Sequence, residues 1–169
     1  MSTTTDRETI SAQSRYLFAQ TARIVSGLSD ERLALEPKPG MKTAGWLLGH
    51  LAVTGDFARR LCGREPLCPR EWRAMFNPGT HPSVDPSTYP SLSTLRDRLQ
   101  AVYDDLSAAF PHVDRSTLDL PNPFVPARDG FPTSGEFVAY IMTGHLAYHM
   151  GQLFAWRAAT GDDKSREPI

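Results

Sequence analysis

The chain has 169 residues, of which 40% are apolar and 22% charged, and its 18 basic side chains are balanced by 19 acidic ones. This length suits one core of substantial size, so we expect residues 1–169 to form a single domain. The apolar content excludes a disordered chain, and the balanced charge excludes a nucleic-acid-binding surface, so we expect no nucleic-acid partner.

The N-terminal stretch MSTTTDRETISAQSRY lacks the basic start and apolar run of a signal peptide. No later apolar run approaches the roughly 20 residues that span a bilayer. Cys62 and Cys68 lie six residues apart without a CxxC motif, which predicts reduced, structural thiols. We therefore expect a soluble cytoplasmic protein that does not enter a membrane.

Apolar residues first recur at helical spacing over residues 6–27, which predicts the first helix. Thr5 and Glu8 are spaced as a capping box at its start, and Gly27 marks its end. Proline and glycine then interrupt the pattern. A second helix is predicted over residues 43–63, with Thr43 as its N-cap.

Residues 64–90 contain six prolines, too many for a long helix. The stretch REWRAMF within them predicts one or two helical turns, and Trp72 and Phe76 supply apolar anchors. We expect an ordered loop. It either covers a functional site, with the two aromatic side chains lining a pocket, or packs on the end of the molecule.

The helical pattern resumes over residues 91–110, which predicts a third helix. A proline-rich connection follows, with a short extended piece predicted near residues 116–121. The fourth helix is predicted over residues 133–160, where Thr133 and Glu136 form a second capping box. Four helices with long proline-rich connections and no alternating pattern predict an all-α protein, a four-helix bundle.

Three histidines lie where helix residues should be buried. His145 and His149 are one turn apart, so both side chains converge on one point. His50 lies in the middle of the second predicted helix among leucines. Packing of that helix against the last one would give three nitrogen ligands with at least one open position, as in a catalytic metal site.

Other residues near the histidines carry weaker signals. Leu146 stands where an HExxH protease has its glutamate, so that mechanism is excluded. Asp56 is predicted to lie on a solvated face, and His81 and His112 lie in loops where no ligand role is expected. No catalytic residue is assigned, because no general base is evident.

Gln152 and Tyr148 lie beside the histidine pair and are candidates for binding a ligand or cofactor. Ordinary helix packing explains both residues as well. The same two explanations hold for the glycines around the histidines: close backbone approach to an ion, or helix packing. These glycines are Gly45, Gly49, Gly144 and Gly151.

Three stretches together resemble the DinB-like family, also described as DinB/YfiT-like metalloenzymes: GWLLGHLAVTGDF, PREWRAMFNPGTHP leading to YPSLSTLRDRL, and HLAYHMGQLFAWR. The resemblance covers nearly the whole chain. Its most specific element is the histidine order His50, His145, His149, followed by GQL.

The resemblance implies an up-down-down-up bundle, usually a homodimer, with nickel or zinc on the three matching histidines. It also implies reactions of low-molecular-weight thiols such as bacillithiol and mycothiol, including mycothiol-dependent maleylpyruvate isomerisation. The isomerase branch has a glutamate among its ligands and a further C-terminal domain. This chain has His145 in the pair and ends soon after its last predicted helix, so we expect it to stand outside that branch.

These expectations favour a metal-dependent thiol S-transferase, which conjugates a low-molecular-weight thiol to a small-molecule electrophile. A metal-dependent hydrolase uses the same open position for water, and it remains an alternative. A third alternative is a non-catalytic metal-binding or stress-response protein.

Overall fold

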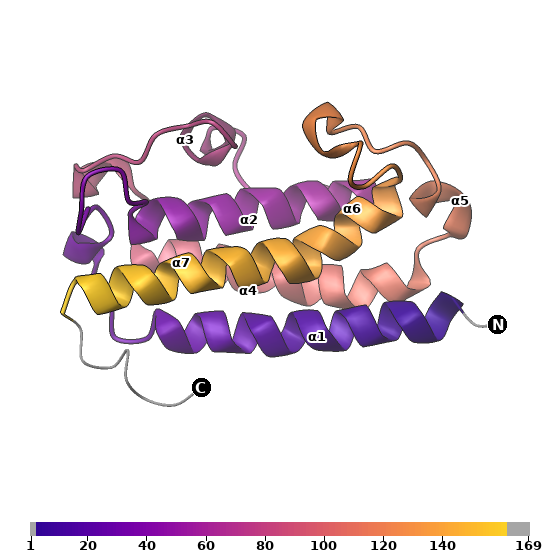
Figure 1. The fold of residues 1–169 in the computed structure, drawn as a ribbon, viewed down its shortest axis with the longest axis horizontal. Coiled ribbons are helices and arrows are strands. Elements are labelled where there is room, and N and C mark those ends of the chain that lie inside the picture. The colour runs from indigo at the N-terminus through magenta and orange to yellow at the C-terminus, as the bar shows by residue number, and fades with distance from the viewer. Residues whose placement is uncertain (1–2, 162–169) are drawn as a thin grey trace.

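Four long helical segments run side by side within residues 3–161, the part of the chain that the computed structural model describes (Figure 1). Side chains are described from residue 6 onwards. The segments are α1 Thr3–Ile24, α2 Ala44–Leu61, α4 Leu92–Ala109, and α6 Ser134–Tyr140, which continues through the π-helical turn Ile141–His145 (η5) into α7 Leu146–Ala159. No strand forms within this range, so the predicted all-α class is confirmed.

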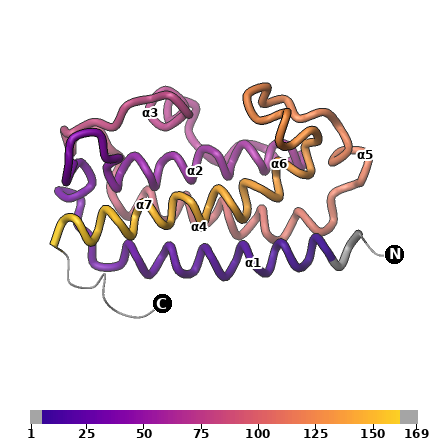
Figure 2. Tube along the Cα trace, in the orientation of Figure 1, coloured from indigo at the N-terminus to yellow at the C-terminus, as the bar shows by residue number. Residues whose placement is uncertain are grey.

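The order of the helices is up-down-down-up, as Figures 1 and 2 show. The connection between α2 and α4 returns along the bundle, so these two helices run in the same direction. Helix α2 packs on α4 and α7, while α1 packs on α4 and α7 from the other side. The predicted four-helix bundle is therefore confirmed, and α2 brings its residues next to those of the last helix.

Capping residues begin and end the helices largely where the sequence places them. The Thr43 hydroxyl accepts a hydrogen bond from the Trp46 amide at 3.3 Å, and Thr133 and Glu136 form both bonds of a capping box. Gly63 follows α2 with a φ of 76°, a left-handed conformation that glycine adopts without strain.

Two local predictions are wrong. Helix α1 already begins at Thr3, so Thr5 lies inside it and not at the predicted N-cap position; no proline or glycine precedes Thr5 to stop the helix from extending. The expected extended piece near residues 116–121 begins as helix α5, Arg115–Leu118. Helical backbone there buries the Leu118 side chain, and extended structure is limited to an isolated bridge from Pro121 to Thr133.

The connection between α2 and α4 is anchored as the sequence predicts. It contains a short helix, α3 Trp72–Phe76, and both aromatic side chains are buried. Helix α3 packs on α2 at Gly49, where an added Cβ atom would lie 2.4 Å from the Phe76 ring. Gly49 therefore permits the close approach of the connection to α2.

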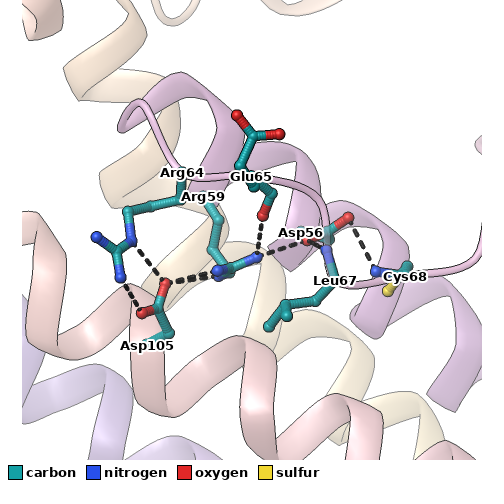
Figure 3. Close-up of polar contacts among 7 residues, drawn as sticks. All are labelled: Asp56, Arg59, Arg64, Glu65, Leu67, Cys68 and Asp105. Carbon is teal, nitrogen blue, oxygen red and sulfur yellow. Dashed lines mark hydrogen bonds and ion pairs between the residues drawn. The ribbon is translucent and has the colours of Figure 1, made fainter.

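Asp56 does not lie on a solvated face, because its side chain is buried under the start of the same connection. Its carboxylate accepts hydrogen bonds from the amides of Leu67 and Cys68 at 2.8 and 3.2 Å (Figure 3). It also pairs with Arg59, which bridges to Asp105 on α4 at 2.8 Å. The two amides lie 11 and 12 residues from Asp56, outside its helix, so the helical pattern around Asp56 did not reveal its burial.

The space between the helices is filled by large apolar side chains such as Trp156, Tyr103 and Leu47. Among the described helices, none combines the length and hydropathy needed to cross a membrane. His50 and His149 are buried within this apolar interior. A buried polar ring destabilises the fold unless its nitrogens have partners, so the contacts of these histidines indicate what the rings bind.

Candidate metal centre

The structure brings together the three histidines that the sequence singles out. His50 projects from α2, His145 is the last residue of η5, and His149 lies one turn later on α7. The Nε2 atom of His145 lies 3.2 Å from Nε2 of His50 and 3.2 Å from Nε2 of His149. One ligand atom from each ring lies within 4.8 Å of the other two, so the three can share one ion.

The π-helical turn η5 ends at His145, and the sequence pattern does not predict this turn. Such turns insert one residue into an α-helix and are frequent at functional sites. Two local features accompany the turn. The Thr143 hydroxyl donates to the Ala139 carbonyl at 2.7 Å, and Gly144 lies under the Tyr140 ring, where a Cβ atom would be 3.0 Å from it. Neither residue type is specific enough to have predicted the turn.

The orientation of His50 is fixed by the connection that follows α2. Its Nδ1 lies 2.7 Å from the Phe76 carbonyl oxygen. Because a carbonyl only accepts, Nδ1 carries the hydrogen and Nε2 presents a lone pair. The ring also stacks on Trp46, with centroids 4.6 Å apart and planes 9° apart. The sequence could not show this contact, since Phe76 contributes a backbone atom.

His149 is oriented by a residue of its own helix. Its Nδ1 lies 2.7 Å from Oε1 of Gln152, whose Nε2 in turn donates to the Tyr148 hydroxyl at 3.3 Å. The His149 Nδ1 therefore donates, and its Nε2 also presents a lone pair. Gln152 lies on the Nδ1 side of the ring, so in this structure it orients His149. Ligand binding by Gln152 or Tyr148 stays a prediction.

The protons of the three rings cannot satisfy the cluster without a further group. Both His50 and His149 direct an Nε2 lone pair at His145 Nε2, whereas His145 Nδ1 is buried and has no hydrogen-bond partner within the described residues. If His145 carries its hydrogen on Nε2, it can donate to the lone pair of only one of the two facing rings, and the other lone pair has no donor. A hydrogen on Nδ1 leaves three lone pairs converging. A divalent cation satisfies all three, so the donor set fits a metal ion.

All three histidines favour the neutral form that binds metals. Burial lowers the pKa of His50 to about 4 and that of His145 to about 3, and it also lowers the pKa of His149. The hydrogen bonds to Phe76 and Gln152 oppose this shift without reversing it. At neutral pH the rings carry no positive charge and their lone pairs are available.

A cavity of about 760 Å³ reaches the histidines from one side. It lies between α2, η5 and the two long connections, which Figure 1 shows on the same side of the bundle. His50 and His145 line it, whereas His149 is not among its lining residues. Its other walls are largely apolar and aromatic. They include Trp46, Val53, Phe57, Cys68, Phe124, Phe131, Phe137, Tyr140 and Ile141.

The two cysteines are both free, as predicted. Cys68 lines the cavity, but burial and the nearby Asp56 charge raise the pKa of its thiol to about 12. Burial also raises the pKa of Cys62 to about 12. Both thiols are therefore protonated and poorly nucleophilic at neutral pH.

Comparison with known proteins agrees with this architecture. The sequence model described as the DinB superfamily matches residues 15–153, a range that contains all three histidines. The chain belongs to the DinB superfamily. This DinB-superfamily chain is also similar to the crystal structure of a conserved protein from Enterococcus faecalis, with a TM-score of 0.67 and 17% sequence identity over 96% of this chain and 99% of that one. No curated protein matches the chain.

For this DinB-superfamily protein the family resemblance of the sequence is thus confirmed, while the low identity of the solved structure supports the fold alone. Among the described residues, His50, His145 and His149 are the group of three metal-ligating side chains that lie close enough to share an ion. His81 and His112 lie outside this group. Trp46, the Phe76 carbonyl and Asp56 contribute to the site without any signal in the sequence.

Proposed function

We propose that this protein is a metal-dependent thiol S-transferase that joins a low-molecular-weight thiol to a small-molecule electrophile. Nickel or zinc would be held by His50, His145 and His149. The observation that carries the proposal is the convergence of three neutral Nε2 atoms next to a large cavity, which His50 and His145 line. A three-nitrogen site of this kind leaves coordination positions for a substrate.

The bound ion supplies Lewis-acid chemistry, which lowers the pKa of a thiol that binds to it and makes its sulfur nucleophilic at neutral pH. The protein residues provide the rest. Phe76 and Gln152 hold the His50 and His149 rings, and the apolar walls exclude water from the sulfur. In the reaction a carbon–sulfur bond forms, the leaving group departs with its electron pair, and the thiol proton passes to solvent.

The properties of the two cysteines favour a reacting sulfur that comes from a co-substrate and not from the chain itself. Cys68 is the cysteine that lines the cavity, and its raised pKa keeps it protonated. Cys62 is buried and its pKa is raised as well. Since a protonated thiol is a weak nucleophile, the reacting sulfur is better supplied by a co-substrate.

The contacts of Asp56 argue against the hydrolase alternative. Hydrolysis at a metal site requires a general base near the water. Asp56 is the carboxylate that lines the cavity, but its oxygens already accept from Arg59, Leu67 and Cys68. These three hydrogen bonds occupy most of the acceptor positions of the carboxylate, so it is poorly placed to take a proton from a metal-bound water.

The assembly and location are part of the same proposal. We propose a homodimer with a small-molecule substrate, as the DinB resemblance implies, and sedimentation of the purified protein tests the dimer. We also propose a cytoplasmic location, which is supported by the two free cysteines, the usual state in a reducing compartment.

The test is turnover with a panel of thiols. Zinc- or nickel-loaded protein is incubated with bacillithiol, mycothiol, glutathione or coenzyme A and a chromogenic electrophile such as a chlorodinitrobenzene, while ester hydrolysis is followed in parallel. We expect conjugation with at least one thiol, its loss in His50→Ala, and its retention in His112→Ala, a control at an exposed histidine. Metal-loaded protein that turns over no thiol would overturn the transferase and favour a non-catalytic metal-binding role.

A further inference from the structure

The charges that line the cavity are mostly positive. Lys42, Arg60 and Arg73 line it, and Asp56 is the carboxylate among its lining residues. Asp56 is paired with the buried Arg59, and the network that these two residues form with Asp105 and Arg64 contains two acidic and two basic side chains. Within the described part of the chain, no ion pair joins Lys42, Arg60 or Arg73 to an acidic side chain. The whole chain has a net charge of −1, so this positive excess does not follow from the overall charge of the chain.

Lys42 places one of these charges at the histidine end of the cavity. Its Nζ atom lies over the Trp46 ring, 4.1 Å from the centroid, and Trp46 itself stacks on His50. The same atom donates to the Thr80 carbonyl at 3.3 Å. The ammonium group is therefore positioned by two contacts next to the candidate metal centre, and neither contact neutralises it.

Part of the cavity lining is an aromatic wall made of Phe57, Phe124, Phe131, Phe137 and Tyr140. The rings contact each other closely: the Phe131 and Tyr140 centroids are 4.4 Å apart, and the Phe124 and Phe137 centroids are 5.6 Å apart. The Arg60 guanidinium lies 5.8 Å from the Phe57 ring centroid. A positive group thus borders the wall as well as the histidines.

We propose that the electrophile bound in this cavity is an organic anion, a molecule with an aromatic or other apolar body and a carboxylate or similar group. That this anion reacts as an electrophile rests on the transferase proposed above, whereas the preference of the cavity for binding an anion does not. An apolar body buries area against the aromatic wall, and the anionic group is attracted by cations that lack an acidic partner. The low-molecular-weight thiols are polar, so the aromatic wall fits the other substrate.

The preference can be measured by binding alone, with three probes that share one ring system. Zinc-loaded full-length protein is titrated with 2-naphthoate, 2-naphthylmethanol and 2-naphthylmethylamine, in the absence of any thiol, by calorimetry. We expect naphthoate to bind at least about tenfold more tightly than the amine at low ionic strength, with the alcohol between them. In 0.5 M NaCl the difference should shrink, because salt screens charges near a surface.

Variants and metal removal locate the source of the preference. The double variant Lys42→Gln/Arg73→Gln should lose most of the preference for naphthoate over the amine. Arg70→Gln is the control and should retain this preference, because Arg70 is an exposed arginine of the same connection that does not line the cavity. Circular dichroism confirms that each variant is folded, and the salt titration needs no variant. Protein stripped of zinc should still prefer naphthoate, because the cations remain.

Two results would overturn the proposal. Equal affinity for naphthoate and naphthylmethanol would show that the cations do not select an anion. A preference that disappears with the zinc and survives in the double variant would assign it to direct binding by the metal. Neither result depends on turnover, so a failure of the transferase proposal would be seen separately, as a lack of conjugation with every thiol.

Discussion

Two of the three candidate ligands are held differently from the third. His50 and His149 each donate from Nδ1 to a fixed acceptor, the Phe76 carbonyl in one case and Gln152 in the other. His145 has no such partner among the described residues, and its ring packs edge-on against Tyr140 and His149. Outer hydrogen bonds fix the tautomer and orientation of metal-binding histidines. The site thus combines two rings oriented in advance with one that depends on the ion.

The backbone compensates for the missing partner of His145. The π-helical turn Ile141–His145 sets where this residue points, whereas His149 follows on regular α-helix. The three candidate metal ligands are thus oriented in two ways. Hydrogen bonds from Nδ1 orient two of the histidine rings, and the geometry of the helix backbone orients the third. This difference also ranks the expected effects of substitutions around the three rings.

The largest effect is expected for His145→Ala, which removes the ligand that links the other two. Zinc at 100 times its dissociation constant should stabilise the native protein by about 2.7 kcal/mol against urea. It should not stabilise His145→Ala, because two nitrogens do not complete the site. Equal stabilisation of the variant would show that zinc binds elsewhere, and His112→Ala serves as the control that keeps the effect.

A smaller loss is expected for Gln152→Leu, which removes the acceptor of His149 Nδ1. Loss of such an outer hydrogen bond typically weakens metal affinity about 10- to 100-fold. Gln152→Glu keeps an acceptor and should retain the affinity. Competition with a chromogenic chelator measures the constants; unchanged affinity in Gln152→Leu would mean that the ring is held by packing alone.

Much of this site could be predicted from the sequence because its signals are local. The i and i+4 spacing of His145 and His149, the mid-helix position of His50, and the caps at Thr43 and Thr133 can each be read from a few neighbouring residues. The bundle then follows from four amphipathic stretches.

The missed features depend on contacts between distant parts of the chain. The Phe76 carbonyl is a backbone atom 26 residues from His50, and the burial of Asp56 depends on loop amides and on Arg59, which is itself held by Asp105 from another helix. The π-helical turn leaves no clear mark in composition. Periodicity cannot report any of these features, since each is decided by tertiary packing.

Gly49→Ala tests how the connection supports His50. The new Cβ atom would lie 2.4 Å from the Phe76 ring, so the ring and its carbonyl must move away. Overpacking of this kind costs about 1–3 kcal/mol of folding free energy, and zinc affinity should fall less than in Gln152→Leu because α3 can shift. Gly151→Ala is the matched control: nothing lies within 4 Å of its Cβ, and alanine should stabilise the helix. Equal effects of the two would contradict the account.

The smallest effect is expected for Tyr148→Phe. The Tyr148 side chain is 62% exposed, and its hydroxyl accepts a hydrogen bond of 3.3 Å from Gln152. Removal of an exposed group of this kind changes stability by less than about 0.5 kcal/mol. Zinc affinity should also stay constant. A clear loss of turnover with normal metal content would instead place Tyr148 in contact with the substrate.

The central claim is that the three Nε2 atoms hold one divalent ion. A crystal structure of zinc-loaded protein, with anomalous diffraction measured at the zinc edge, tests this most directly. The account predicts one anomalous peak per chain, about 2.0–2.1 Å from Nε2 of His50, His145 and His149, with a further position open toward the cavity. A peak at other residues, or zinc-saturated crystals with no peak between the three rings, would contradict it.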